Sequence, residues 1–443
     1  MKLLHTGDWH VGRSLGRVSR LEETRAALSE MAGIAESEDV DVVLVCGDVF
    51  EHQSPSAEAE QVVYEALLRF GRDGRSVVLL AGNHDHPGRW RALAPLLQRF
   101  DIHVVDDLRR ATDGGIIDIR SRDGKELMQI AAIPWVSERR LFEGRALMSG
   151  EKPYTSYAEG MGAAVKELCD HFSADACRIL AGHLYISGTV PSGSERPLVV
   201  GDTYAVLPNA VRETNAQYIA LGHVHRPHQV IETPLCRYAG SPIRLDFGEV
   251  KEQKSVTVVE VHPGLPVAAH EVPLRSLKLF LDLHCTLDEL EGFREEAKDA
   301  YVRVKLKCGG PAPGLSDQVR EIIPGALIIS LDYPEKSLPD AVDVRSKTPR
   351  QLFEGYLSVR SEAEPDPELL GLFDSLLAEV SASPSGGRLW SDEAEGPNGT
   401  GREAANGESD SEVAELLPLP ASSDNGDTVT IQPAMEALEV PGS

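Results

Sequence analysis

The chain has 443 residues, of which 70 are acidic and 44 basic, and its formal net charge is −26. This charge argues against a protein that holds nucleic acid through a uniformly basic surface. The length exceeds what one hydrophobic core usually supports, so we expect two or three domains.

No stretch of the sequence predicts a membrane span or a targeting signal. The chain begins directly with a strand-like run, and no apolar stretch approaches the ~18 residues that a span requires. The six cysteines form no Cys-x-x-Cys pair, which favours free thiols in a reducing compartment. We therefore expect a soluble, cytoplasmic protein that does not associate with a membrane.

The first 105 residues alternate between strand-like and helical patterns. Short apolar runs predict strands, and apolar residues at helical spacing predict the helices between them. The expected strands are Lys2–Thr6, Val42–Cys46, Val77–Ala81 and Ile102–Val105, and the expected helices are Leu21–Ser37, a helix opened by Ser54-Pro55-Ser56 that ends at Phe70, and Arg91–Phe100. This alternation predicts an α/β sheet covered by helices.

The next part, up to residue 262, is richer in strands. Asp123-Gly124 separates two alternating runs and is a strong hairpin signal. We expect strands at Ile116–Arg120, Leu127–Ile133, Cys177–Ala181, Tyr218–Leu221, His228–Glu232, Arg237–Ala239 and Ser255–Val261, and a helix at Tyr157–His171. Residues 1–275 are therefore predicted to form a sandwich of two sheets flanked by helices.

A smaller unit follows at about Ser276. Its expected elements are strand Leu277–Leu283, helix Thr286–Ala300, strand Tyr301–Lys307, helix Leu315–Ile323 and strand Ala326–Asp332. This alternation predicts a small α+β cap domain over residues 276–340.

Two amphipathic segments lie between Thr348 and Val380. Thr348-Pro349-Arg350-Gln351 has the spacing of a capping box, and Asp366-Pro367 opens a second helix in the same way. We interpret residues 341–381 as C-terminal helices that dock a partner protein through an apolar stripe; packing on the chain's own cap is the alternative. The stripe contains Leu352, Phe353, Tyr356, Leu357, Leu369, Leu370, Phe373, Leu376, Leu377 and Val380. Residues 382–443 are rich in Ser, Gly, Pro and acids, which predicts a disordered acidic tail.

Five of the short apolar runs end in Gly, Asp, Asn or His. These ends are Asp8-Trp9-His10, Gly47-Asp48, Gly82-Asn83-His84-Asp85, Gly182-His183 and Gly222-His223-Val224-His225. In open α/β folds the strand ends meet at one edge of the sheet, where sites form. A single histidine of this kind is more often structural, but five independent repeats of the pattern favour a metal site.

The candidate ligands are mixed oxygen and nitrogen donors: Asp8, His10, Asp48, Asn83, His183, His223 and His225. One ion rarely needs seven protein ligands, whereas two ions that share a bridging carboxylate would use them all. Such donors suit manganese, iron or zinc, and the absence of cysteine removes the strongest signal for zinc.

In this order the motifs resemble those of the calcineurin-like metallophosphoesterases, over about residues 1–262. Protein Ser/Thr phosphatases of that family carry Gly-Asp-x-Val-Asp-Arg-Gly, whereas this chain has Gly47-Asp48-Val49-Phe50-Glu51-His52-Gln53. Three further segments and the cap resemble the nuclease subunits of bacterial nuclease–ATPase complexes, over about residues 1–360. The segments are Asp8-Trp9-His10-Val11-Gly12-Arg13, Tyr238-Ala239-Gly240-Ser241-Pro242-Ile243 and Phe247-Gly248-Glu249. Related archaeal nucleases often have a histidine at the position of Glu51, so His52 is left out of the catalytic set.

The resemblance implies a role for each candidate ligand. One metal ion, expected to be Mn²⁺, would take Asp8, His10 and His225; the other would take Asn83, His183 and His223, and Asp48 would bridge them. His84 would stabilise the transition state and protonate the leaving 3′-oxygen. Asp85 would orient His84, or it would only cap the turn.

The implied activity is that of a manganese-dependent DNA nuclease in repair, recombination and replication. It would act as a 3′-5′ exonuclease on duplex ends and as an endonuclease on single-stranded or hairpin DNA. A small-molecule phosphodiesterase or nucleotidase on the same fold is the alternative, and a non-catalytic scaffold is a third hypothesis.

The resemblance also implies partners: an ATPase subunit, and a homodimer within a heterotetramer. Two arginine clusters follow ligand loops and would hold DNA phosphates, unless they are ordinary solvated arginines. The clusters are Arg13, Arg17 and Arg20, and Arg89 and Arg91. Because the chain is acidic, we expect the ATPase partner to supply most of the affinity for DNA.

Overall fold

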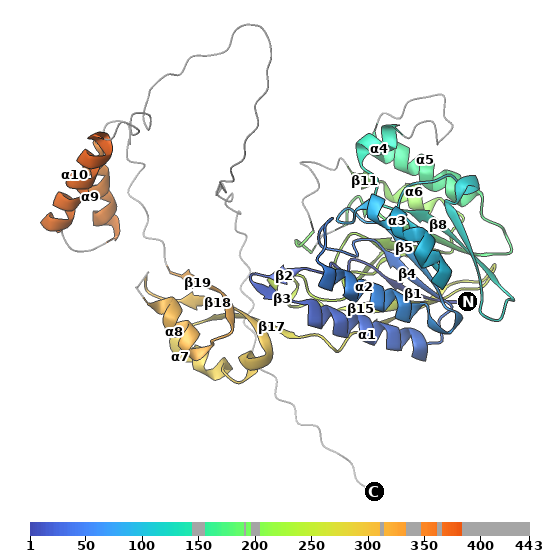
Figure 1. Cartoon of the computed structure of the whole chain (residues 1–443), viewed down its shortest axis with the longest axis horizontal. Helices are drawn as coiled ribbons and strands as arrows, with labels where there is room; N and C mark the ends of the chain where they lie inside the picture. Colours follow the sequence, from blue (N-terminus) through green and yellow to red (C-terminus); the bar gives the residue numbers. More distant parts are fainter. Residues whose placement is uncertain are drawn as a thin grey trace, which may run out of the picture. The chain divides into compact units, whose positions relative to one another are not determined.

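The computed structural model describes residues 1–143, 156–189, 192–195, 204–310, 314–333, 347–360 and 366–382. They belong to two compact units, Met1–Ser337 and Leu338–Ser443. Figure 1 shows both units and labels many of their elements.

The first unit contains a mainly parallel six-stranded sheet in the order β16-β15-β1-β4-β5-β6. Its strands are β16 (Ala268–Pro273), β15 (Ser255–Glu260), β1 (Lys2–Thr6), β4 (Val42–Cys46), β5 (Ser76–Leu80) and β6 (Ile102–Val105). Strands β1, β4, β5 and β6 are parallel, so their carboxyl ends lie at the same edge.

A second six-stranded sheet has the order β13-β14-β12-β9-β8-β7. Its strands are β13 (His228–Ile231), β14 (Leu235–Tyr238), β12 (Tyr218–Gly222), β9 (Cys177–His183), β8 (Leu127–Ile133) and β7 (Ile116–Arg120). The hairpin predicted at Asp123-Gly124 is confirmed, because β7 and β8 pair antiparallel around it.

The two sheets pack face to face and share one core. Alternate residues of a strand point to opposite faces. Leu3, Val42 and Leu44 therefore join Ile130 and Ile179 of the other sheet between the layers. Both faces of β4 are covered, which explains why its sequence is a continuous apolar run.

Helices cover the outer face of each sheet, so the predicted sandwich is confirmed. Over the first sheet lie α1 (Leu21–Ser37), α2 (Ala57–Phe70) and α3 (Pro87–Leu97), and over the second lie α4 (Glu138–Glu143), α5 (Tyr157–Asp170) and α6 (Pro208–Arg212). Helix α3 begins four residues before the predicted start, because Pro87 takes the first helical position and the side chain of His86 caps it.

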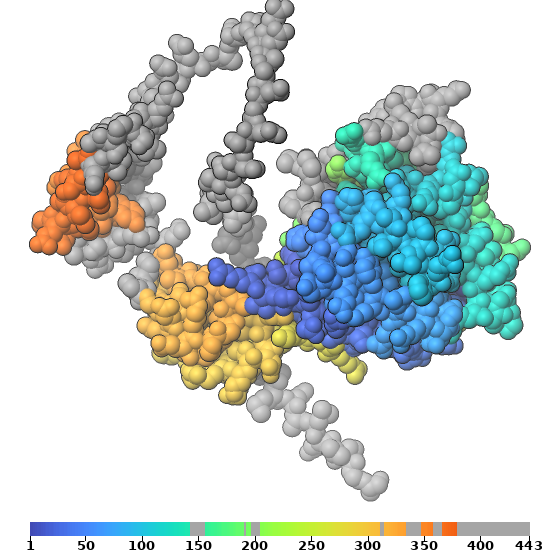
Figure 2. Space-filling view, viewed as in Figure 1, coloured from blue at the N-terminus to red at the C-terminus, as the bar shows by residue number. Residues whose placement is uncertain are grey.

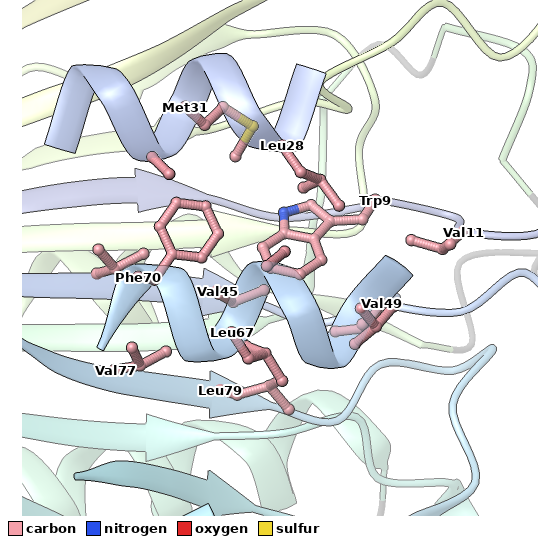
Figure 3. Packing of buried hydrophobic residues seen from close by; sticks show 14 of the residues in the cluster. Trp9, Val11, Leu28, Met31, Val45, Val49, Leu67, Phe70, Val77 and Leu79 are labelled. Carbon is pink, nitrogen blue, oxygen red and sulfur yellow. The ribbon is translucent and has the colours of Figure 1, made fainter. Parts of the chain in front are cut away.

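Trp9 anchors the loop after β1. Its indole is fully buried in the core between α1 and α2, with its ring centroid 5.8 Å from that of Phe70 (Figure 3). Its Nε1 donates a hydrogen bond to Thr6 Oγ1 at 3.1 Å. Because Trp9 stands between Asp8 and His10, this packing holds both predicted ligands in place.

The cap is a three-stranded parallel sheet with helices and has a hydrophobic cluster of its own. Its elements are β17 (Leu279–Cys285), α7 (Leu287–Leu290), β18 (Ala300–Lys307), α8 (Leu315–Ile322) and β19 (Ala326–Asp332). The predicted helix Thr286–Ala300 is wrong in length: α7 is one turn with a capping box, and short 3₁₀ turns follow it. Gly292, a poor helix former, lies just after α7.

The cap contacts the sandwich through the short hairpin of β2 (Ser14–Leu15) and β3 (Val18–Ser19). Leu15 packs with Phe280 and Tyr301 of the cap, and Figure 2 shows the hairpin against the cap. The guanidinium of Arg20 lies 5.2 Å from the centroids of both aromatic rings. These contacts support the predicted cap, whose boundaries at residues 276 and 340 remain a prediction.

The second unit contains α9 (Pro349–Arg360) and α10 (Pro367–Ala382). Both predicted caps are confirmed: Thr348 and Gln351 form a capping box, and Asp366 accepts a hydrogen bond from Glu368 N. Phe353 and Phe373 stack between the helices with centroids 4.2 Å apart. The predicted acidic tail lies outside the described residues.

Several short elements were not predicted from the sequence. They are β2, β3, β10 (Tyr185–Ile186), β11 (Ala205–Val206), α4, α6 and the edge strand β16. All six cysteines belong to the described residues and are free thiols, as predicted. Among the described helices, none is both long and apolar enough to cross a membrane.

Two neighbouring leucines of α2 test the packing. Leu67 is fully buried, whereas Leu68 is 42% exposed. Leu67→Ala should lower the free energy of unfolding by about 2–5 kcal/mol, because it leaves a cavity under α2. Leu68→Ala should change it by less than about 0.5 kcal/mol. Urea denaturation measures both values, and equal losses would contradict the packing described.

Candidate metal centre

The seven predicted ligands and His84 meet where the carboxyl ends of β1, β4, β5, β9 and β12 converge. The residues form three groups, and within each group the ligand atoms all lie within 4.8 Å of one another. The groups are Asp8, His10 and His225; His10, Asp48 and His84; and Asp48, His183 and His223. The prediction that these strand ends share one site is confirmed. Whether each residue binds a metal remains a prediction.

The ligand loops adopt an unusual backbone conformation. Asp8, His10, Asp48 and His223 have φ angles of 51°, 47°, 48° and 97°. Few non-glycine residues adopt positive φ, and such residues concentrate at functional sites. Backbone hydrogen bonds from Asp8 N to Gly47 O (2.9 Å) and from His10 N to Asp48 O (3.0 Å) hold two of these loops together.

Glycines let the loops approach one another closely. A Cβ atom at Gly47 would lie 2.2 Å from His183 Nδ1, and one at Gly82 would lie 2.1 Å from Asp48 Oδ1. A Cβ atom at Gly222 would lie 1.9 Å from the carbonyl oxygen of Cys46. Only glycine fits at these three positions, which directly precede Asp48, Asn83 and His223.

One side of the centre presents two imidazole nitrogens to each other. His10 Nδ1 lies 2.9 Å from the Glu51 carboxylate, so it carries the proton and Nε2 is left as an acceptor. His225 Nδ1 bonds Ser194 Oγ at 2.6 Å, and Ser194 in turn donates to Glu249. His225 Nε2 is thus an acceptor too, 3.1 Å from His10 Nε2. Two facing acceptors suit a bound cation.

The other side has the same character. His183 Nδ1 donates to Cys46 O at 2.8 Å, which leaves Nε2 as an acceptor 3.0 Å from Asn83 Oδ1. His223 Nδ1 lies 3.0 Å from the same amide oxygen. Asp48 Oδ2 is 3.7 Å from His10 Nε2 and 3.5 Å from His183 Nε2, so this carboxylate lies between the two sides.

The electrostatics of the centre also fit divalent cations. Burial, reinforced by the nearby Asp48, raises the pKa of Asp8 to about 7 although His183 opposes the shift. Burial and the adjacent His183 lower the pKa of His223 to about 3, and burial and His10 hold the pKa of His225 well below its usual value. Burial opposes the shift, but Asp48 raises the pKa of His183 to about 9, and Glu51 and Asp48 raise that of His10. A divalent metal ion binds an imidazole only in its neutral form, so binding at this centre would release protons from these two rings.

His84 and Asp85 bond to different partners in the loops around the centre. His84 Nδ1 donates to the carbonyl oxygen of Glu51 at 2.8 Å. The Asp85 carboxylate accepts hydrogen bonds from the backbone N–H groups of Gly82, Val49 and Phe50. The prediction that Asp85 orients His84 is therefore not supported, because this carboxylate is committed to the turn, which was its alternative role.

Glu51 is a supporting residue that the sequence analysis missed. Its two carboxylate oxygens bond His10 Nδ1 and Arg13 Nη1, each at 2.9 Å, while its backbone oxygen holds His84. One residue thus positions both a candidate ligand and the candidate acid. Its position directly after Gly47-Asp48-Val49-Phe50 is the feature of the sequence that could have identified it.

A second missed group lies behind His225. Glu249 and Lys254 are both fully buried, and their charged atoms are 2.6 Å apart. Ser194 links Glu249 to His225 Nδ1, and Lys254 Nζ donates to the carbonyl oxygen of His225 at 3.0 Å. Glu249 belongs to the Phe247-Gly248-Glu249 segment, whose function the sequence alone did not reveal.

Most of the arginines predicted to hold DNA phosphates are paired with carboxylates. Arg13 pairs with Glu51, Arg89 with Glu60 and Arg91 with Asp106. Arg20 is fully buried against Glu23 and the cap, so its predicted DNA contact is not supported. Arg17 is exposed and has no ion pair within the described part of the chain.

A centre of buried Asp and His residues with the half-buried Asn83, at the joined edges of a two-sheet sandwich, defines a metallophosphoesterase that binds divalent metal ions. Residues 1–227 match the model of the calcineurin-like phosphoesterase family. Residues 271–360 match the model described as the type 5 capsule protein repressor C-terminal domain, SbcD_C.

Curated relatives narrow the class. The chain is 32% identical over 393 residues to the SbcD subunit of nuclease SbcCD from Bacillus subtilis, covering 86% of this chain and 98% of the relative. It is 30% identical to the same protein of Rhodobacter capsulatus (80% and 93% covered) and 30% identical to that of Escherichia coli (69% and 78% covered). The chain belongs to the SbcD family of calcineurin-like metallophosphoesterases.

Glu51→Ala should weaken Mn²⁺ binding about 10- to 100-fold, because His10 loses the carboxylate that orients its ring. Isothermal titration calorimetry with Mn²⁺ measures the affinity. His52→Ala is the matched control, since His52 is the exposed neighbour and should leave the affinity unchanged. Equal Mn²⁺ affinities for the two variants would rule out the positioning role of Glu51.

Proposed function

We propose that this chain is the nuclease subunit of an SbcCD-type complex in DNA repair, recombination and replication. It hydrolyses phosphodiester bonds with Mn²⁺, as a 3′-5′ exonuclease on duplex ends and an endonuclease on single-stranded or hairpin DNA. The observation that carries the proposal is the Asp48 carboxylate between two groups of acceptor ligands, in a chain whose relatives are named as nucleases.

In this proposal Asp8, His10 and His225 hold one ion, Asn83, His183 and His223 hold the other, and Asp48 bridges them. Divalent cations in such a site supply Lewis-acid stabilisation of a phosphodiester and make water more acidic. Mixed oxygen and nitrogen donors without cysteine favour Mn²⁺ over a structural zinc site.

His84 is the proposed acid. The carbonyl oxygen of Glu51 fixes its Nδ1, so Nε2 remains for an oxygen of the substrate. Its side chain lies against His10, with ring centroids 4.6 Å apart, and therefore beside the ligands. In the imidazolium form both ring nitrogens carry a proton, so Nε2 can deliver one to the departing 3′-oxygen while Nδ1 keeps its hydrogen bond. Burial lowers the pKa of His84, which makes this proton easier to give up.

An SbcC-type ATPase is the proposed partner, within a heterotetramer that contains two copies of this chain. Phe353 and Phe373 pack inside the helix pair, but four apolar side chains of α9 and α10 are at least 41% exposed. These residues are Tyr356, Leu369, Leu372 and Leu376. An exposed apolar face on a helix pair suits a partner helix, such as the root of a coiled coil.

Three substrates test the proposed activity with Mn²⁺: linear duplex DNA, hairpin DNA and bis-p-nitrophenyl phosphate. Cleavage of both DNAs supports the nuclease. Turnover of the small ester alone would instead favour a small-molecule phosphodiesterase or nucleotidase, and the carboxylate-paired arginines beside the site are the observation that keeps this alternative open. No turnover of any substrate would indicate a non-catalytic scaffold.

Two substitutions separate metal binding from proton transfer. His84→Ala should keep both ions and lose about 10²–10⁴-fold in rate, because only the proton donor is removed. Asp48→Asn should lose ions as well as activity, because it weakens the bridge. Elemental analysis and DNA cleavage rates measure both effects. Loss of an ion in His84→Ala would place His84 among the ligands.

Replacing exposed leucines tests the docking surface. The double variant Leu369→Glu, Leu376→Glu should weaken binding to an SbcC-type ATPase at least about tenfold, because charges would enter the apolar contact. Thermal stability should be preserved, and the exposed Glu368→Gln is the control. Co-purification and thermal melts measure the two effects. Lost stability with unchanged partner binding would favour packing within the chain.

A further inference from the structure

A cavity of about 540 Å³ opens at the segment that follows the candidate ligand His225. Three short segments wall it: Ser187–Thr189, the end of α6 with Arg212, and Arg226–Ile231. Its volume lies in the range of small-ligand sites. We call it the arginine pocket.

Two walls of the arginine pocket continue directly from candidate metal ligands. Arg226 follows His225, and consecutive Cα atoms are ~3.8 Å apart. Ser187 stands four residues after His183, at the end of β10. Both of these walls therefore begin within four residues of a candidate ligand along the chain.

The lining is basic in a chain with a large excess of acid. Arg212 and Arg226 are both exposed, and neither makes an ion pair within the described ranges. None of the lining residues is Asp or Glu. This differs from the arginines near the ligand loops, where Arg13, Arg89 and Arg91 are neutralised by carboxylates.

The pocket wall is also rigid. His228 stacks on Tyr238 with centroids 5.2 Å apart, and its Nδ1 donates to Arg226 O at 2.8 Å. Gly240 packs closely against the turn at Pro227, because a Cβ atom at Gly240 would lie 2.6 Å from Pro227. The backbone of Arg226 is thus held in place before a ligand arrives, which lowers the entropy cost of binding.

We propose that the arginine pocket binds a backbone phosphate of the DNA strand, a few nucleotides from the bond that is cleaved. Arg212 and Arg226 supply the positive charge that pairs with the phosphate. The inference rests on the proposed nuclease function and assigns part of its substrate path.

The test compares the double variant Arg212→Ala, Arg226→Ala with Arg120→Ala. Arg120 is an exposed arginine on β7, at the opposite edge of the same sheet from β13. Fluorescence anisotropy with a labelled single-stranded oligonucleotide gives Kd at several salt concentrations. Steady-state cleavage gives KM and kcat for DNA, and turnover of bis-p-nitrophenyl phosphate gives a reference for a substrate too small to reach the pocket.

The double variant should raise Kd and the KM for DNA about tenfold, relative to Arg120→Ala. The slope of log K against log salt should fall by about 0.7 for each phosphate contact that is lost. The preference for DNA over bis-p-nitrophenyl phosphate should fall by about the same tenfold factor. Values of Kd, KM and the salt slope equal to those of Arg120→Ala would overturn the proposal that the pocket binds a phosphate.

The outcomes also separate this inference from the proposed function. Absence of DNA cleavage by the unaltered chain refutes both. Normal cleavage, with variants that behave like Arg120→Ala, refutes only the arginine pocket. Weakened binding of a deoxynucleoside monophosphate with unchanged binding of the oligonucleotide would overturn the assignment to the DNA backbone.

Discussion

The metal centre depends on how closely the two sheets approach each other at Cys46. The carbonyl oxygen of this residue accepts a hydrogen bond from His183 Nδ1 and lies where any side chain at Gly222 would stand. One carbonyl group at the end of β4 thereby sets the tautomer of one candidate ligand and the position of the loop that carries His223 and His225. A larger separation of the sheets would divide the centre into two incomplete halves.

Several buried polar residues support the candidate ligands from outside the centre. Glu51 bonds Nδ1 of His10, and Ser194 bonds Nδ1 of His225, in both cases on the side of the ring that faces away from the centre. Glu249 and Lys254 lie behind Ser194 and pair with each other. Burying charges is costly unless they are paired and hydrogen-bonded. Their pairing here leaves the inward nitrogens of His10 and His225 as acceptors, which is the form that binds metal ions.

The distribution of arginine side chains explains how an acidic chain can act on an anionic polymer. Near the ligand loops, arginines are paired with carboxylates and strengthen the structure rather than the affinity for phosphate. Arg20 also joins the sandwich to the cap, because its guanidinium packs against two aromatic rings of the cap. Arg17, Arg212 and Arg226 are exposed and have no ion pair within the described residues, and the last two line the pocket proposed to bind a phosphate.

The sequence alone determined the sandwich, its main strands and helices, and the set of candidate ligands. It did so because strands buried on both faces are continuous apolar runs, and because each ligand stands directly after one of them. The edge strand β16 was missed, since its exposed residues lack that pattern. Only the tertiary structure decided which groups support the ligands, because Glu249 and Lys254 meet His225 through folding and not through spacing. The burial of Arg20 and the commitment of Asp85 to backbone N–H groups were decided in the same way: a side chain's partners depend on distances between segments that are far apart in the chain.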